Sequence, residues 1–306
     1  IGLFLVASYL FRWVSPLPVL AVALLGGLLA ATLGLAGFFE VGPRSLLDGL
    51  LPSLTVDRAS GAFGNANFLG LYLAQVSLLT IGLLAVARAR YHPALLLLIV
   101  VFIAALLLTY SRSAYIGFMA GLIVLAFLRS SRAGIALMLV SAVAIVFLYP
   151  AFLNARLGSD VLDASTITQR AISEEGRRLA AAAGVSLFLT APVFGVGFGI
   201  FHELSPAFVG ASQATYSHNM YIQILAEQGI IGALLSATIV VMLLLAIFRS
   251  DNPLRRPALA MLGAYLFQSF FINSLVSLQA SGLTWLVMAA ALSAWPHRSG
   301  PRTQEV

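Results

Sequence analysis

Cysteine and lysine do not occur in this chain of 306 residues, and charged residues of all kinds make up only 9% of it. The lack of cysteine excludes disulfides, cysteine-ligated zinc, iron–sulfur clusters and thiol catalysis. The low charge excludes an ordinary water-soluble enzyme, since such domains carry about 25% charged residues. Hydrophobic residues make up 60% of the chain. That is enough for about nine bilayer crossings of about 20 residues each.

Long apolar runs bounded by Arg, Pro or Gly predict an all-α polytopic bundle of membrane helices, with one domain over residues 1–306. The chain begins within such a run, without Met or a basic leader, so we expect earlier spans to be missing rather than a signal peptide to have been cleaved. Nine candidate spans are predicted: Ile1–Val14, Leu17–Phe39, Phe63–Ala87, Ala94–Leu108, Ser113–Leu128, Gly134–Tyr149, Ile230–Phe248, Pro257–Leu275 and Gly282–Trp295.

The arginines divide unevenly between the two sides of this topology. One set of alternate connections carries ten arginines and two acidic residues, whereas the other carries seven arginines and nine acidic residues. Because basic residues in short loops prefer the cytoplasm, we expect the first side and the C-terminus to be cytoplasmic. The other side is then the outer side, and it holds all four motifs described below.

The longest connection on the outer side runs over residues 151–218. It contains an apolar run, Leu179–Leu189, that is too short to cross a bilayer, so we expect a helix along the membrane surface. Ser173 is the predicted N-cap of this helix, and Glu174 and Glu175 suit the positive end of its dipole.

Two short motifs place polar groups at ends of the predicted spans. Asn65 and Asn67 lie beside glycines at the entrance of the third span, where they can donate to a ligand or cap a helix. Arg112 lies in a very short turn between two spans, where it can bind an anionic phosphate or snorkel to the interface. An outer arginine at this place runs against the positive-inside bias.

A third motif combines arginines with a run of glycines in the long outer connection. The glycines of Gly195–Gly199 follow a proline and an apolar helix rather than a strand, which argues against a dinucleotide-binding turn. A turn that lets the backbone approach a ligand or another helix fits better. Arg177 and Arg178 are candidate ligands or solvated charges. Arg178 and Arg170 are both treated as substitutes for Arg177, because spacing does not separate the three.

The fourth motif begins at His218 and leads into the seventh predicted span. On a helix, Asn219, Gln223 and Glu227 form one polar stripe. The amino terminus of that helix lowers the pKa of His218, which favours the neutral form that accepts a proton. An ordinary polar cap of a membrane helix is the alternative interpretation. The four histidines form no ligand-spaced pair, so we expect no metal and no cofactor.

Together these segments resemble the O-antigen ligase and polymerase superfamily of bacterial inner membranes. Ala66 stands where that family often has proline. The matching segments follow the family's order and cover about residues 60–235: Phe63–Phe68, Leu108–Arg112, Gly176–Arg177 followed by Pro192–Gly197, and His218–Asn219 through Glu227 and Gly229.

The resemblance implies a glycosyltransferase that needs neither metal nor nucleotide sugar. Such an enzyme passes a glycan from an undecaprenyl-pyrophosphate carrier to a hydroxyl acceptor, the lipid A core or a growing polysaccharide, at the periplasmic face of the inner membrane. His218 is then the catalytic base, and no nucleic acid is expected as a partner. The implied substrate-binding residues are Arg112, Arg177, Arg178, Asn65, Asn67, Asn219 and Glu227.

Other functions stay open at this point. A transporter or flippase of lipid-linked oligosaccharides would use the same arginines to bind headgroups. It predicts ionisable residues along a path inside the spans, but the spans are nearly free of charge. A scaffold of an envelope-synthesis complex would use the long outer connection for docking. Within glycan transfer, a protein hydroxyl is a further possible acceptor.

Overall fold

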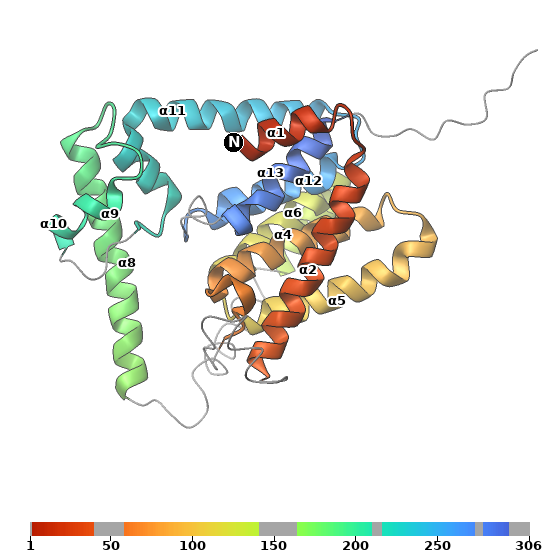
Figure 1. Cartoon of the computed structure of the whole chain (residues 1–306), viewed down its shortest axis with the longest axis horizontal. Coiled ribbons are helices and arrows are strands. Elements are labelled where there is room, and N and C mark those ends of the chain that lie inside the picture. The colour runs from red at the N-terminus through yellow and green to blue at the C-terminus, as the bar shows by residue number, and fades with distance from the viewer. Residues whose placement is uncertain (1, 40–57, 141–163, 210–215, 273–277, 294–306) are drawn as a thin grey trace, which may run out of the picture.

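The computed structural model describes residues 2–39, 58–140, 164–209, 216–272 and 278–293, and every regular element in these ranges is a helix (Figure 1). The α-helices are α1 (Gly2–Leu10), α2 (Pro16–Phe38), α4 (Ala66–Leu84), α5 (His92–Leu108), α6 (Arg112–Arg129), α8 (Ala164–Thr190), α9 (Phe201–Leu204), α10 (Pro206–Val209), α11 (Met220–Arg249), α12 (Arg255–Gln268) and α13 (Leu278–Leu292), and the short 3-10 turns are η1 (Gly61–Phe63) and η2 (Ala89–Tyr91).

Five of these helical segments are long and apolar enough to cross a membrane: α2, α4, η2 together with α5, α6 and α11. They confirm the prediction of a polytopic helical membrane protein. The other predicted spans correspond to shorter helices, since α1, α12 and α13 have 9, 14 and 15 residues. The run Gly134–Tyr149 extends past residue 140 and so lies partly outside the described residues. The full set of nine spans stays a prediction.

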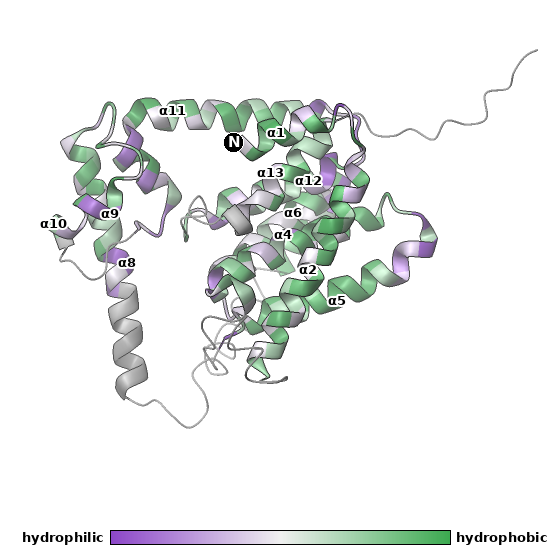
Figure 2. Cartoon of the chain, viewed as in Figure 1, coloured by the Kyte–Doolittle hydropathy of each residue, from purple (hydrophilic) through white to green (hydrophobic). Residues whose placement is uncertain are grey.

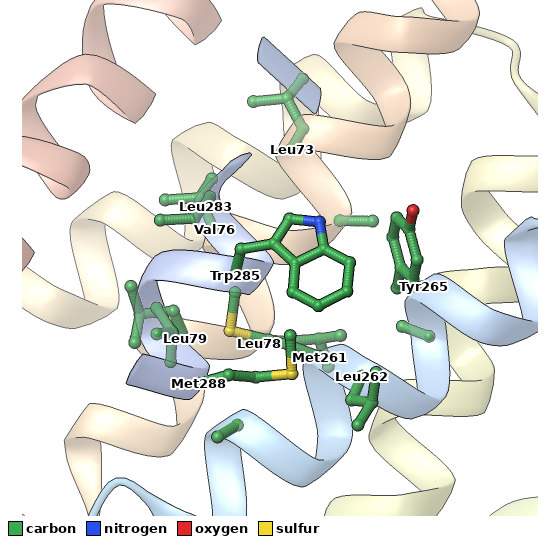
Figure 3. Packing of buried hydrophobic residues seen from close by; sticks show 14 of the residues in the cluster. Leu73, Val76, Leu78, Leu79, Met261, Leu262, Tyr265, Leu283, Trp285 and Met288 are labelled. Carbon is green, nitrogen blue, oxygen red and sulfur yellow. The ribbon is translucent and has the colours of Figure 1, made fainter. Parts of the chain in front are cut away.

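Helix α4 is the centre of the bundle. In its most apolar stretch 72% of the residues are buried, whereas in that of α11 only 11% are buried. Helices α5, α6, α12 and α13 all pack against it. From α13, the ring of Trp285 is packed among side chains of α4 and α12 (Figure 3). Large apolar side chains on α2, α5 and α11, such as Leu25, Leu97 and Met242, are exposed, as a bilayer requires, and Figure 2 shows these helices coloured mostly as hydrophobic.

Helices α8, α9 and α10 form a lobe with the first two turns of α11, beside the bundle, and α8 runs across the end of α11 rather than alongside it (Figure 1). Leu179–Leu189 lies in the C-terminal half of α8. The predicted N-cap at Ser173 is wrong, because α8 already begins at Ala164 and Ser173 lies inside it. The first half of α8 is polar but carries helix-favouring residues, so a search for apolar runs does not detect it.

The helix ends gather into two groups. At one end, the Ala59 N–H donates to the Leu108 carbonyl at 2.9 Å, close to the start of α4, and the Met220 N–H donates to the Ser269 carbonyl at 2.9 Å. At the opposite end, the Ser250 hydroxyl donates to the Ala291 carbonyl at 2.7 Å. The first group brings together the chain ends that carry the sequence motifs.

Candidate functional site

Asn65 and Asn67 have different tasks at the start of α4. Asn65 is the N-cap, and its side-chain oxygen accepts from the Asn67 backbone N–H at 2.8 Å. The side-chain oxygen of Asn65 therefore caps the helix, as the capping interpretation predicts. Its side-chain NH2 group can still donate a hydrogen bond to a ligand. The side chain of Asn67 instead points toward a second segment of the chain.

Asn67 joins the first two motifs into one cluster. Its side-chain oxygen accepts from the Arg58 guanidinium at 2.9 Å and from the Ser111 hydroxyl at 3.1 Å. The Arg58 Nε also donates to the Thr109 carbonyl at 2.8 Å. Ser111 is the residue before α6, so this network fixes the turn from which Arg112 begins the helix. We call Arg58, Asn67, Thr109, Ser111 and Arg112 the arginine turn.

The backbone of the arginine turn is held in an uncommon conformation. Tyr110 has φ of 48°, in the left-handed region that residues with a Cβ rarely occupy. Such a conformation persists where surrounding contacts enforce it, and it often marks a functional site. Arg58 was not among the predicted site residues, although an arginine nine residues before Asn67 on the predicted outer side was a detectable signal.

Of the predicted polar stripe, Gln223 and Glu227 lie on α11 and face the protein interior, whereas Asn219 precedes the helix as its N-cap. The Gln223 Nε2 donates to the Glu227 carboxylate at 2.8 Å, and both side chains are buried. The same carboxylate accepts from the Phe201 N–H at 3.3 Å, while the Gln223 oxygen accepts from the Ser217 N–H at 3.2 Å. The stripe therefore ties α9 and the approach to α11 together, which gives Glu227 a structural task.

The glycine run Gly195–Gly199 packs against α11. Approach to another helix was one of the two predicted alternatives, and approach to a ligand was the other. The Val196 N–H donates to the Ala226 carbonyl at 2.9 Å, and the Ile230 N–H donates to the Pro192 carbonyl at 2.9 Å. Gly195 and Gly229 meet at the centre of this pairing, both with positive φ, and a Cβ on either one would overlap the other segment's backbone. The turn thus provides hydrogen-bond partners for backbone N–H and C=O groups of α11 at its kink.

His218 lies directly before α11 with φ of 54°, a second non-glycine residue in the left-handed region. Asn219 is the N-cap of α11 and accepts from the N–H groups of Tyr221 and Ile222 at 2.9 and 3.1 Å. The half-buried imidazole has its pKa lowered first by burial and second by the positive charge of Arg177. A lowered pKa was predicted for His218 from the positive end of the helix, whereas burial and Arg177 are its causes in the structure.

Arg177 and Arg178 occupy different faces of α8. Arg177 shares its face with Ala180 and Gly184, and Gly184 packs against Ser217 and Ile222 beside His218. The side chain of Arg178 is 77% exposed and forms an ion pair with Glu175 at 2.6 Å. That pair lowers the pKa of the Glu175 carboxyl through the hydrogen bond from Arg178. Geometry therefore distinguishes the two arginines where spacing did not.

The C-terminal end of α12 connects the arginine turn to the lobe that carries His218. The Gln268 Nε2 donates to the Ala114 carbonyl at 3.4 Å, two residues after Arg112. The next residue, Ser269, accepts from Met220, two residues after His218. The segments that begin at Arg112 and His218 thus both contact the C-terminal end of α12, at Gln268 and at its C-cap Ser269. Among the described residues, no three of the types that ligate metals gather into a cluster.

The match to a known family covers the part of the chain that contains most of these residues. Residues 94–237 match the family model described as O-antigen ligase. This range runs from α5 to the first part of α11 and contains Arg112, Arg177 and His218, whereas Arg58 and Asn67 precede it. No curated protein matches the chain. Over this range the chain is similar to the O-antigen ligase family.

Proposed function

We propose that the protein transfers a glycan from an undecaprenyl-pyrophosphate carrier to a hydroxyl acceptor, with His218 as the catalytic base. The observation that carries this proposal is that burial, and after it the positive charge of Arg177, lowers the pKa of the His218 imidazole, which favours its neutral form. The same charge can attract an anionic leaving group. A base and an anion-binding group are the two elements that this transfer requires.

In the proposed reaction, the acceptor oxygen attacks the anomeric carbon and its proton passes to the imidazole of His218. The bond from the anomeric carbon to the phosphate oxygen breaks, and the electron pair leaves with the pyrophosphate. The negative charge that develops there is stabilised by Arg177 from the lobe and Arg112 from the arginine turn. Because pyrophosphate is a good leaving group, the step needs no further acid.

The proposed acceptor is the lipid A core or a growing polysaccharide, and the proposed place is the periplasmic face of the bacterial inner membrane. Asn65, Asn219 and Arg178 are proposed to assist substrate binding through their donor groups. Arg178 is the weakest of these assignments, since its guanidinium already pairs with Glu175. The contacts of Glu227 favour support of the site over direct contact with substrate.

The test is the His218→Asn variant of the full chain, supplied with lipid-linked glycan and acceptor. Asparagine tolerates the left-handed conformation of residue 218 better than alanine, and its amide cannot take up the proton. We expect transfer to fall at least 100-fold, as loss of a general base does. The matched control is His202→Asn, because the side chain of His202 in the same lobe is 58% exposed. Full activity of His218→Asn would remove the base assignment.

A further inference from the structure

A patch of exposed apolar side chains lies on the lobe where it joins the long segment of α11. The exposed fractions are 69% for Leu189, 51% for Val193, 74% for Phe194 and 79% for Phe198. No charged residue occurs between Leu189 and Gly199. In water, two phenylalanine rings exposed to this extent within five residues are unfavourable, so a partner surface is expected.

The apolar segment of α11 sets the depth of this patch relative to a bilayer. Ile230–Phe248 contains 19 residues without a charge, and Arg249 follows it. At about 1.5 Å per residue the segment is about 28 Å long, close to the roughly 30 Å hydrocarbon core. With Arg249 at one boundary, Ile230 lies at the other.

Backbone hydrogen bonds fix the turn at that same level. The Ile230 N–H donates to Pro192 at 2.9 Å and the Ile231 N–H donates to Val193 at 3.2 Å. Ile230 and Ile231 are themselves 47% and 41% exposed, so the apolar surface of α11 continues into the turn without a break. The buried Glu227 lies immediately before this boundary.

We propose that the turn Ala191–Gly199 is embedded in the lipid interface, with Phe194 and Phe198 as its anchors. Aromatic and apolar side chains bind the interfacial region in this way when the neighbouring backbone is held by protein. The observations favour lipid as the partner that covers the patch, because the patch continues the lipid-facing surface of α11. The anchor fixes the lobe at the level of the lipid headgroups.

The experiment uses two single-cysteine variants of the full chain, Phe194→Cys and Phe198→Cys, each carrying a nitroxide label. The chain has no native cysteine, and both positions are exposed, so no other residue needs to change. The protein is reconstituted into vesicles of phosphatidylethanolamine and phosphatidylglycerol. Collision rates of each label with oxygen and with a water-soluble nickel chelate are then measured. Arg178→Cys is the water-facing reference and Leu234→Cys the reference inside the span.

We expect both labels to collide with oxygen several-fold more often than the label at position 178, and with the nickel chelate several-fold less often. Their depth should lie between the two references. Nickel accessibility equal to that at position 178 would overturn the proposal. Spin–spin broadening between labels on two molecules would also overturn it, because a second copy of the chain would then cover the patch. No activity is measured, so the outcome is independent of the proposed glycan transfer.

Discussion

At the scale of single residues, the lowered pKa of His218 has two opposing effects on the role of base proposed for it. Burial and the charge of Arg177 keep the imidazole neutral at physiological pH, so it can accept a proton. The same lowering of its pKa makes the imidazole a weaker base. Its activity as a base should therefore fall only when the pH drops below the ordinary histidine range.

The variant Arg177→Gln should move the acid limb of the pH–rate profile to higher pH. Removing the positive charge favours the imidazolium, which raises the pKa of His218, so the neutral form is lost at a higher pH than before. The measurement is kcat/KM for glycan transfer against pH. Arg178→Gln is the control, because that side chain is exposed and paired with Glu175, and its acid limb should stay in place. An unmoved limb in Arg177→Gln would contradict the electrostatic link.

At the scale of elements, the kink in α11 depends on one conformation that glycine alone adopts easily. Gly229 has φ of 65° and ψ of −166°, and the backbone at Val193 lies directly against its Cα. This close approach lets α11 change direction at Gly229. The glycine-rich turn then forms hydrogen bonds with the backbone groups of α11 on either side of the kink. The lobe is held to the membrane-spanning segment through this joint.

Gly229→Ala should destabilise the protein by about 1–3 kcal/mol or more, from backbone strain together with the overlap of the new methyl group with Val193. The measurement is thermal unfolding of the purified protein in detergent. Gly26→Ala is the matched control: Gly26 is an exposed position within α2, and its new Cβ would meet only the Tyr72 hydroxyl at 3.4 Å. That variant should be neutral or slightly stabilised, since alanine favours a helix. Equal stability of the two variants would show that the kink carries no strain.

Apolar runs were sufficient to predict α2, α4, α5, α6 and the long segment of α11, because a bilayer imposes length and hydropathy on each helix separately. The same criterion missed the polar half of α8, because it selects only apolar runs. Helix boundaries that depend on local polar contacts were therefore predicted least well.

The candidate site was predictable as a set of motifs but not as a set of contacts. His218 and the stripe of Gln223 and Glu227 follow from spacing on one helix. The bonds from Arg58 and Ser111 to Asn67 join residues 9 and 44 positions apart in sequence, and no periodicity indicates them. The pairing of the glycine run with α11 depends likewise on tertiary structure.

At the scale of the whole molecule, the cluster of Arg249, Arg255 and Arg256 and the sequence motifs lie at opposite ends of the bundle. The end that joins α11 to α12 carries Arg249, Arg255 and Arg256, and Gly82 of α4 packs there against Pro257. The other end carries the arginine turn and the start of α11. This arrangement agrees with the alternation on which the predicted orientation rests, and it makes that orientation testable with two single cysteines.

Cysteines placed at Tyr91 and Glu203, one in each of two variants, should report opposite sides of the membrane. Tyr91 is 48% exposed in η2 among the arginines of the predicted cytoplasmic end, and the Glu203 side chain is 65% exposed in the lobe. In spheroplasts, an impermeant thiol reagent should label position 203 directly and position 91 only after the membrane is permeabilised. The unmodified chain has no cysteine and is the blank. The reverse labelling would contradict the predicted orientation and would place His218 on the cytoplasmic side. Other segments of the chain would then have overridden the positive-inside bias.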